Sequence, residues 1–276
     1  MQHLIKRAIN SLGFDIKRLD KRCGTKGPSF CFDYGHKLGY DFEGEADTLI
    51  QKIRLNTMLP YVNLLTLYEQ AVFCEKNKIP GSFIECGVWK GGAVGLLALA
   101  NLKYGKERRH IHLFDVFDDI CEPDANIDGQ RAIKDARTYA GKDTGTAGKL
   151  KPLRGFYDNF GGRGTIEENR DLLERIIGYP PHYLSYHKGW FQDTLPKDSD
   201  DIDAIAILRL DGDWYASTKI CLEYLYDKVV PGGFIIIDDY GCYEGCKKAV
   251  DSFIEERGLA IFLNYSDPSC RYWIKH

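Results

Sequence analysis

The chain of 276 residues carries 37 basic and 40 acidic side chains, for a formal net charge of −3. Because this balance offers no overall attraction for phosphate backbones, and no long basic run is present, we expect no nucleic-acid partner. Nine scattered cysteines with no secretory segment before them indicate reduced thiols and a cytoplasmic location. No apolar run approaches the roughly 20 residues needed to span a bilayer, and the length suits one elaborated α/β domain.

The first 80 residues are expected to form an N-terminal helical cap or lid region. Residues 1–22 place apolar side chains on one helical face with basic ones around it, and the apolar set is Leu4, Ile5, Ala8, Ile9 and Leu12. This amphipathic helix is expected to pack on the body of the protein, with weak contact with an anionic membrane surface as the alternative. Residues 23–45 predict a loop, and the apolar spacing from Ala46 to Asn77 predicts a helix that Pro80 and Gly81 end.

From residue 81 to residue 276, strand-like and helix-like segments alternate. Strands are predicted at 82–86, 110–117, 182–189, 203–211 and 233–239. Helices are predicted at 92–105, 165–178, 217–228 and 244–256. This alternation predicts a mostly parallel sheet with helices on both faces. Two β-rich runs close the chain, at 259–265 and 270–276, and the short turn that joins them predicts an antiparallel last strand.

Residues 118–164 interrupt this alternation. The segment is polar and glycine-rich, has no helical or strand periodicity, and contains AGKDTGTAGK and NFGGRG. A long irregular segment inside a compact domain is typically a functional lid or a mobile loop. We therefore expect residues 81–276 to form the main domain, with a lid-like insertion at 118–164 that closes over a substrate.

The first predicted strand runs into the sequence ECGVWKGG, residues 85–92. Its glycines, Gly87, Gly91 and Gly92, let the backbone turn sharply and approach a ligand at the start of a helix. The stretch lacks the G-x-G-x-x-G order of a dinucleotide site, which makes a nicotinamide dehydrogenase a poor alternative. The next strand ends on Asp115, whose carboxylate is suited to accept hydrogen bonds from both hydroxyls of a ribose. Together these features predict a nucleoside-bearing cofactor.

Pairs of aspartates follow two further predicted strands. Asp211 and Asp213 come after one strand, and Asp238 and Asp239 come after the next. Because neighbouring strands of a sheet lie about 4.8 Å apart, the carboxyl ends of two parallel strands bring these side chains within reach of each other. Uncompensated carboxylates would raise one another's pKa, so a cation is expected between them. The oxygen ligand set favours Mg²⁺.

Several stretches make the sequence similar to the macrocin O-methyltransferase family of S-adenosylmethionine-dependent sugar methyltransferases. They extend from about Leu49 to the C-terminus and are RLNTM, GSFIECGVWKGG, LFDVFD, KGWFQDTLP, RLDGDWYAST, LYDKVVPGGFIIIDDYG and CKKAVDSF. The resemblance implies an α/β class I methyltransferase fold of the Rossmann-like type. It also implies Mg²⁺-dependent transfer of a methyl group to a sugar hydroxyl of a glycosylated natural product, nucleotide sugar or glycan. We further expect a homo-oligomer.

The resemblance also implies site residues, by their positions in the matching stretches. The metal ligands would be Asp211, Asp238 and Asp239. The cofactor-binding residues would be Thr57, Met58, Glu85, Gly87, Asp115, Gly189 and Trp190. The chain departs from the family at Ala216, where an acidic residue is usual, and in the greater length of the 118–164 insertion.

The expected mechanism is in-line displacement at the sulfonium methyl by a sugar oxygen, with Asp211 or Asp213 as the catalytic base. Related enzymes that methylate catechols and caffeoyl esters carry a lysine where this chain has Trp214, which disfavours a catechol acceptor. Trp214 and Tyr215 could stack on a sugar face or pack against the following helix. The remaining alternatives are O-methylation of a non-sugar phenolic acceptor and a methyltransferase-fold binding or assembly protein without catalysis.

Overall fold

The structure is a computed structural model that describes residues 41–141 and 150–276. At its centre lies a seven-stranded sheet with the order β3-β2-β1-β4-β5-β7-β6. The strands are β1 (Ser82–Cys86), β2 (Ile111–Asp115), β3 (Leu184–Lys188), β4 (Ile205–Leu210), β5 (Val229–Ile237), β6 (Asn264–Tyr265) and β7 (Arg271–Ile274). The pairs among β1 to β5 are parallel, and β7 is antiparallel to β5 and β6. This topology confirms the predicted mostly parallel sheet with an antiparallel last strand.

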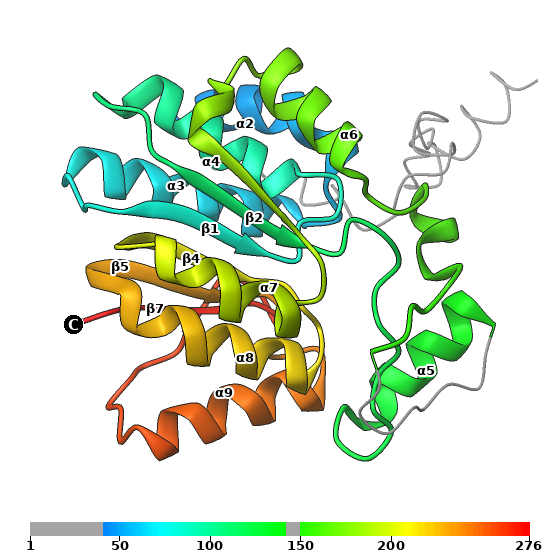
Figure 1. Ribbon diagram of the computed structural model, residues 1–276. Helices are drawn as coiled ribbons and strands as arrows, with labels where there is room; N and C mark the ends of the chain where they lie inside the picture. The colour runs from blue at the N-terminus through cyan, green and yellow to red at the C-terminus, as the bar shows by residue number, and fades with distance from the viewer. Residues whose placement is uncertain (1–40, 142–149) are drawn as a thin grey trace, which may run out of the picture.

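Helices cover both faces of this sheet (Figure 1). One layer consists of α2 (Asp41–Ile53), α3 (Tyr61–Lys76), α4 (Gly92–Tyr104) and α6 (Ile166–Arg170), which continues as a π-helix over Asp171–Ile176. The other layer consists of α7 (Phe191–Asp198), α8 (Tyr215–Leu225) and α9 (Glu244–Glu256). Successive strand residues point to opposite faces, so Phe83 packs into the first layer and Ile84 into the second. Both faces of the central strands are therefore buried, which explains their continuous apolar runs.

The predicted helix over 46–77 is wrong as a single element. It consists of α2 and α3, separated by a 3₁₀ turn (Arg54–Asn56) and an extended segment that begins at Thr57 and ends at Pro60. The ring of Pro60 disfavours a helical conformation in the residue before it, which separates the two helices, and α3 begins at Tyr61. The predicted loop also ends earlier than expected, because α2 begins at Asp41. The predicted helix in residues 1–22 lies outside the described residues.

Two further elements differ from the prediction. The sequence did not indicate α7, because Pro196 within it resembles a helix breaker. The run 259–265 was expected to be a strand, but only Asn264 and Tyr265 pair with β7. Leu259, Ile261 and Leu263 pack partly against the core without strand pairing. In the described ranges, no helix combines the length and the apolar character that a membrane span requires.

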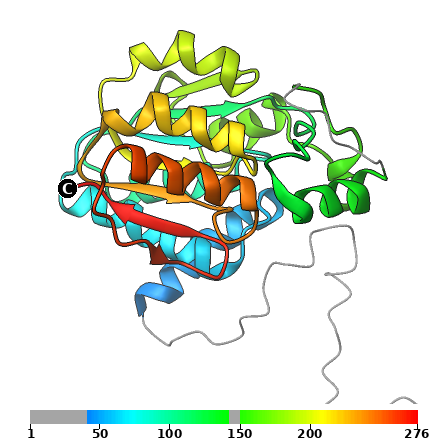
Figure 2. The ribbon, with the colours of Figure 1, turned by 90° about the horizontal axis from the view of Figure 1, so that it is seen from below.

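The 118–164 insertion contains regular structure, contrary to the prediction. A helix, α5 (Gly129–Ala140), and a 3₁₀ helix, Phe156–Phe160, form part of it. Ala136, Leu153 and Phe156 are buried together and give these two elements a small core of their own. Both views place α5 beyond one end of the strands (Figures 1 and 2), where it contacts α9 of the second layer. The insertion therefore lies over the carboxyl edge of the sheet, where the predicted site residues are located.

Candidate active site

Two cavities lie at the carboxyl ends of the strands, and Asp211 and Asp213 line both of them. The larger has a volume of about 420 Å³ and lies between the extended segment after α2, the turn from β1 to α4, and α5. The smaller has a volume of about 60 Å³. The predicted residues that line the larger cavity are Thr57, Met58, Glu85, Asp211, Asp213, Asp238 and Asp239. Those that line the smaller one are Gly87, Asp115, Gly189, Trp190, Asp211 and Asp213.

Asp211, Asp238 and Asp239 are brought together as the sequence predicts. Each offers one carboxylate oxygen, and these oxygens lie within 4.8 Å of one another. The register of the sheet is responsible, because Leu210 of β4 pairs with Ile237 of β5 and the aspartates follow these two residues directly. The backbone N–H of Asp238 also donates to the carbonyl oxygen of Leu210 at 2.9 Å. This arrangement can hold a divalent cation with oxygen ligands.

Asp213 lies in the turn that follows β4, beside this acidic cluster. Its φ angle is +59°, which a non-glycine residue rarely adopts, and its backbone N–H donates to Oδ2 of Asp239 at 3.2 Å. Burial, with the neighbouring charges of Asp211 and Asp238, raises the pKa of Asp213 well above its ordinary value. The turn therefore holds a fourth carboxylate at the wall shared by the two cavities.

Arg209 is a site residue that the sequence analysis missed. Its guanidinium group donates to Oδ2 of Asp211 at 2.8 Å and to Oδ1 of Asp238 at 2.6 Å, and it also bonds to Glu85. The register explains the contact with Glu85, because Glu85 of β1 and Arg209 of β4 are direct partners. The available signal was a single arginine within the apolar strand IAILRL. Burial opposes the charge, but the three carboxylates outweigh it and raise the pKa of Arg209 well above its ordinary range.

Glu85 lines the larger cavity but faces Arg209 through only one oxygen. Its side chain is 1% exposed, and Oε2 is buried with no hydrogen-bond partner in the described ranges. An unpaired buried oxygen costs free energy until a donor reaches it. Burial raises the pKa of Glu85 to about 8, although Arg209 opposes the shift. The unpaired oxygen fits a ligand that carries an ammonium or other N–H donor.

Asp115 ends β2 and holds the glycine-rich turn that follows β1. Its Oδ2 accepts hydrogen bonds from the backbone N–H groups of Val88 at 2.6 Å and Trp89 at 3.1 Å. Its Oδ1 accepts one from Phe117 at 2.6 Å. A carboxylate has about four acceptor positions, so one remains for a ligand such as a ribose hydroxyl. Burial raises the pKa of Asp115, and the three N–H groups oppose this shift.

Glycine is required at Gly87, where the chain leaves β1. Its φ angle is +90°, and a Cβ there would lie 1.8 Å from the carbonyl oxygen of Asp211. Gly92 has the same role at the start of α4, where a Cβ would lie 2.6 Å from Cβ of Thr57. The backbone of the turn thus approaches both the acidic cluster and the extended segment after α2, which explains why these distant residues share one cavity.

The insertion adds residues that the sequence analysis did not indicate. Arg131, Asp135 and Tyr139 of α5 line the larger cavity, together with Phe156 and Phe160. Trp214, in contrast, is 2% exposed and donates from Nε1 to the carbonyl oxygen of Cys121 at 2.9 Å. Of the two interpretations for Trp214, packing is therefore correct. The aromatic wall comes from two elements that a glycine-rich stretch separates in the sequence, so their meeting could not be read from either element alone.

The strand order and the position of the cavities define a class I methyltransferase fold. A family model described as Macrocin-O-methyltransferase (TylF) matches residues 25–141 and 176–275. The chain belongs to this family and is an S-adenosylmethionine-dependent O-methyltransferase, which removes the alternative of a non-catalytic assembly protein.

Individual relatives agree with this assignment. Demethyldecarbamoylnovobiocin O-methyltransferase of Streptomyces niveus is 32% identical over 235 residues, which cover 85% of this chain and 78% of that protein. The 8-demethyl-8-(2,3-dimethoxy-alpha-L-rhamnosyl)-tetracenomycin-C 4'-O-methyltransferase of Streptomyces olivaceus is 27% identical over 236 residues, 86% of this chain and 78% of that protein. The solved structure of the O-methyltransferase NovP has a TM-score of 0.64 and 30% identity, and the match covers 80% of this chain and 82% of that one.

Proposed function

We propose that this enzyme methylates a sugar hydroxyl in a Mg²⁺-dependent reaction. The observation that carries the proposal is the approach of Asp211, Asp238 and Asp239 at the wall of the larger cavity. Oxygen ligands of this kind are those that Mg²⁺ prefers. The tetracenomycin relative described above, whose name specifies a rhamnosyl group, supports a sugar as the acceptor.

The acidic cluster fits a metal ion even though Arg209 is already present. Arg209 uses one oxygen of Asp211 and one of Asp238, which leaves the second oxygen of each carboxylate, together with Asp239, for a metal. Bound Mg²⁺ supplies a Lewis acid that makes a sugar hydroxyl easier to deprotonate. Burial and Asp211 raise the pKa of Asp238 to about 7, so an added positive charge would favour its ionised form.

The cofactor is assigned to both cavities. Gly87, Asp115, Gly189 and Trp190 would hold its adenosine part, because a ribose can use the remaining acceptor position of Asp115. The unpaired oxygen of Glu85 would accept a hydrogen bond from its amino group. Thr57 and Met58 would cover it from the segment between α2 and α3.

Asp213 is the proposed catalytic base, with Asp211 as the alternative. Asp211 is bonded to Arg209 and belongs to the metal cluster. No basic side chain of the described ranges forms an ion pair with Asp213, so its carboxylate can receive the hydroxyl proton. Its position on the wall of both cavities places it between the assigned cofactor and acceptor regions.

The larger cavity favours a sugar attached to an uncharged group over a nucleotide sugar. Of its described lining residues, seven are carboxylic acids, namely Glu85, Asp135, Asp211, Asp213, Asp238, Asp239 and Asp267. The two arginines are Arg209, which is bonded to three of these carboxylates, and Arg131, whose Nε lies 3.7 Å from Asp135. This surplus of negative charge would repel the diphosphate of a nucleotide sugar. The rings of Tyr139 and Phe160, 4.9 Å apart, offer an apolar wall instead.

Mass spectrometry of methyl transfer tests the proposal. The protein is incubated with S-adenosylmethionine, Mg²⁺ and a panel of sugars, each supplied as a methyl glycoside, an aryl glycoside and a nucleoside diphosphate sugar, with free phenols as controls. We expect one added methyl group on a glycoside, a lower KM for the aryl form, and an aryl preference that Phe160→Ala removes. Phe262→Ala, at a 79% exposed position, is the matched control. Transfer to phenols alone would contradict a sugar acceptor.

A further inference from the structure

The segment 161–169, which leads into α6 and includes most of it, forms hydrogen bonds with the turn between β1 and α4. The indole Nε1 of Trp89 donates to the carbonyl oxygen of Gly162 at 3.0 Å, and Nζ of Lys90 donates to that of Gly161 at 2.7 Å. Trp89 itself has a φ angle of +47°, a conformation that is costly for a bulky residue and persists only where its surroundings impose it. The turn is therefore held in place by a segment about 75 residues further along the chain.

Asn169 is the main residue of this segment in contact with the turn. Its side chain is fully buried, and Nδ2 donates to the carbonyl oxygens of Trp89 at 2.8 Å and Thr165 at 2.9 Å. Its Oδ1 lies against the turn as well, because a Cβ on Gly91 would be 2.4 Å from it. Asn169 lies between the two stretches that match the family model, in residues 142–175.

Asp115 holds the same turn from the opposite side. Asp115 accepts the N–H groups of Val88 and Trp89, while Asn169 donates to the carbonyl group of Trp89. The peptide groups on both sides of Trp89 are thus fixed, one by each anchor. Val88 and Trp89 line the larger cavity, and Gly87 lines the smaller one. Loss of either anchor would let the turn relax away from the left-handed conformation of Trp89.

We propose that Asn169 is a positioning residue, which presets the β1–α4 turn for S-adenosylmethionine and so sets the affinity for the cofactor. The inference rests on the proposed function only in that the turn contacts the cofactor. Asn169 itself lines neither of the two cavities. Its effect is exerted through the backbone of Trp89 and Gly91, in the way that a supporting residue holds a binding group within a narrow range of positions.

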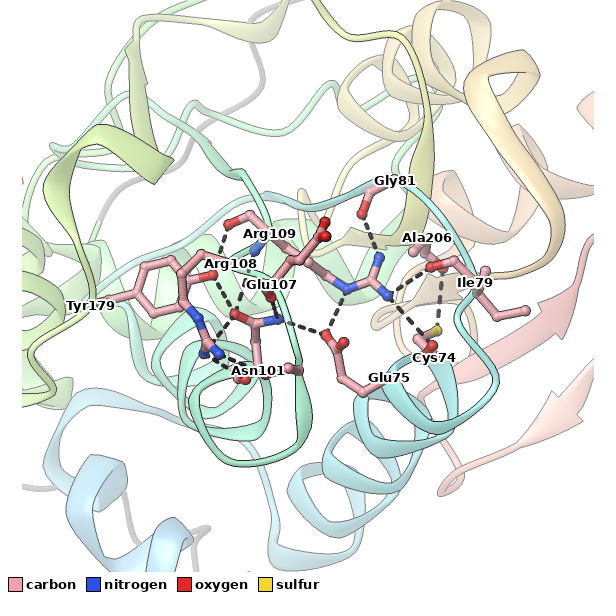
Figure 3. Close-up of polar contacts among 11 residues, drawn as sticks. Cys74, Glu75, Ile79, Gly81, Asn101, Glu107, Arg108, Arg109, Tyr179 and Ala206 are labelled. Atoms are coloured by element: carbon pink, nitrogen blue, oxygen red, sulfur yellow. Dashed lines mark hydrogen bonds and ion pairs between the residues drawn. The ribbon is translucent and has the colours of Figure 1, made fainter.

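The test compares Asn169→Asp with a matched control, Asn101→Asp. Asn101 is also a fully buried asparagine, and its Nδ2 likewise donates to two acceptors, Glu75 at 2.9 Å and the carbonyl oxygen of Glu107 at 3.0 Å. It belongs to a polar network with Arg109 and Tyr179 before the amino ends of β1 and β2 (Figure 3). None of these three residues lines either cavity. Each substitution replaces the amide by a carboxylate of the same shape and removes two Nδ2 hydrogen bonds, but only the one at Asn169 faces the turn.

Two measurements are made on each variant well below its Tm. We expect Asn169→Asp to weaken S-adenosylhomocysteine binding by about five- to ten-fold, the scale of one hydrogen bond, and to speed hydrogen exchange of the amides of Val88 and Trp89. Asn101→Asp should lower Tm while leaving both quantities unchanged. Equal effects in the two variants, or none in Asn169→Asp, would overturn the inference. If either variant fails to fold, the Asn→Ser pair is used. If the wild-type protein does not bind S-adenosylhomocysteine, the cofactor assignment is refuted. The hydrogen-exchange data would still test whether Asn169 holds the β1–α4 turn.

Discussion

Arg209 allows three carboxylic acids to lie close together at one edge of the sheet. A buried arginine bonded to Glu85, Asp211 and Asp238 offsets part of their mutual repulsion, although burial has removed Arg209 and Glu85 from water. Such a cluster adds little net stability, because the desolvation of its members opposes their attraction, but it holds their side chains in fixed orientations. The outcome for the site is that two of the proposed metal ligands are oriented before any metal binds.

We therefore predict that Arg209→Met destabilises the protein by about 3–5 kcal/mol, the usual cost of leaving buried partners uncompensated. Denaturant unfolding at pH 7 measures this free energy. Arg209→Lys keeps the charge but cannot form the same fork of hydrogen bonds, so its loss should be smaller. A Met variant as stable as the wild type would mean that the carboxylates are neutral in the absence of Arg209.

The proposed base and the proposed metal ligands can be separated by two isosteric variants. Asp238→Asn should raise the Mg²⁺ concentration needed for activity, because it removes a charged ligand. Asp213→Asn should retain metal binding and lower kcat by about 10²- to 10⁴-fold at saturating Mg²⁺, the scale of general-base catalysis. Steady-state kinetics across a metal titration distinguishes the two defects. Near-normal turnover in Asp213→Asn would shift the base assignment to Asp211.

Asp115 holds the turn and is also the proposed partner of the cofactor ribose, which makes its substitution informative. We predict that Asp115→Ala weakens S-adenosylhomocysteine binding by about 1.5–3 kcal/mol, because charged hydrogen bonds are lost, and changes Mg²⁺ affinity far less. Calorimetry with each ligand gives both numbers. The asymmetry is the essential point: equal losses for metal and cofactor would indicate general disruption of the site.

At the scale of elements, β2 and β3 carry a stack of histidines that the mechanism does not use. Nδ1 of His112 lies 3.1 Å from Nε2 of His187, whose Nδ1 lies 2.8 Å from Asp198, and His110 stacks on His112 at 4.6 Å. Burial, with the neighbouring His110 and His187, lowers the pKa of His112 to about 3. His112 is therefore neutral in the folded protein at pH 7.

This stack predicts a pH dependence of stability. Below pH 6.5 the unfolded chain binds a proton at His112 that the folded chain does not, so stability is lost as pH falls from about 6.5 towards 3. Between pH 7 and pH 5 the loss from this residue is about 2 kcal/mol, from 1.36 kcal/mol per pH unit below the unfolded pKa. Urea unfolding across this range should show the slope in the wild type and in the exposed variant His182→Gln, and a reduced slope in His112→Gln.

The helix of the insertion was missed although its pattern is present in the sequence. Ala132, Ala136, Tyr139 and Ala140 recur at helical spacing along α5, but the two that are fully buried have small side chains, and a glycine-rich stretch follows them. The small core that orders α5 is completed by Leu153 and Phe156, which come after the intervening glycine-rich stretch. A contact between segments so separated leaves no periodic pattern.

At the scale of the whole molecule, the proposed function requires two independent ligands on one edge of the sheet. We predict that a chelator abolishes methyl transfer, that added Mg²⁺ restores it, and that the affinity for S-adenosylhomocysteine changes by less than about three-fold, because the metal stabilises charge at the acceptor and not the cofactor. Turnover and calorimetry on the same chelator-treated sample test both parts. Full activity without any divalent ion would contradict the metal-dependent mechanism.

The sequence by itself determined the architecture and the edge at which the site lies. Short apolar runs and amphipathic helices follow from local periodicity, and aspartates placed at the end of β2 and directly after β4 and β5 must emerge at the carboxyl edge of a parallel sheet. This is why Asp115, Asp211 and Asp238 could be predicted as site residues before any packing was known. Such information is contained within each segment.

Only the tertiary structure decided which partners these residues have. Arg209 meets Glu85, 124 residues away, because of the register between β1 and β4, and Asn169 meets Trp89 because α6 packs beside the glycine-rich turn. Local propensity cannot specify either contact, since register and helix placement depend on burying apolar surface across the whole sheet at once. The roles of Arg209 and Asn169 in orienting the site could therefore be recognised only from the folded structure.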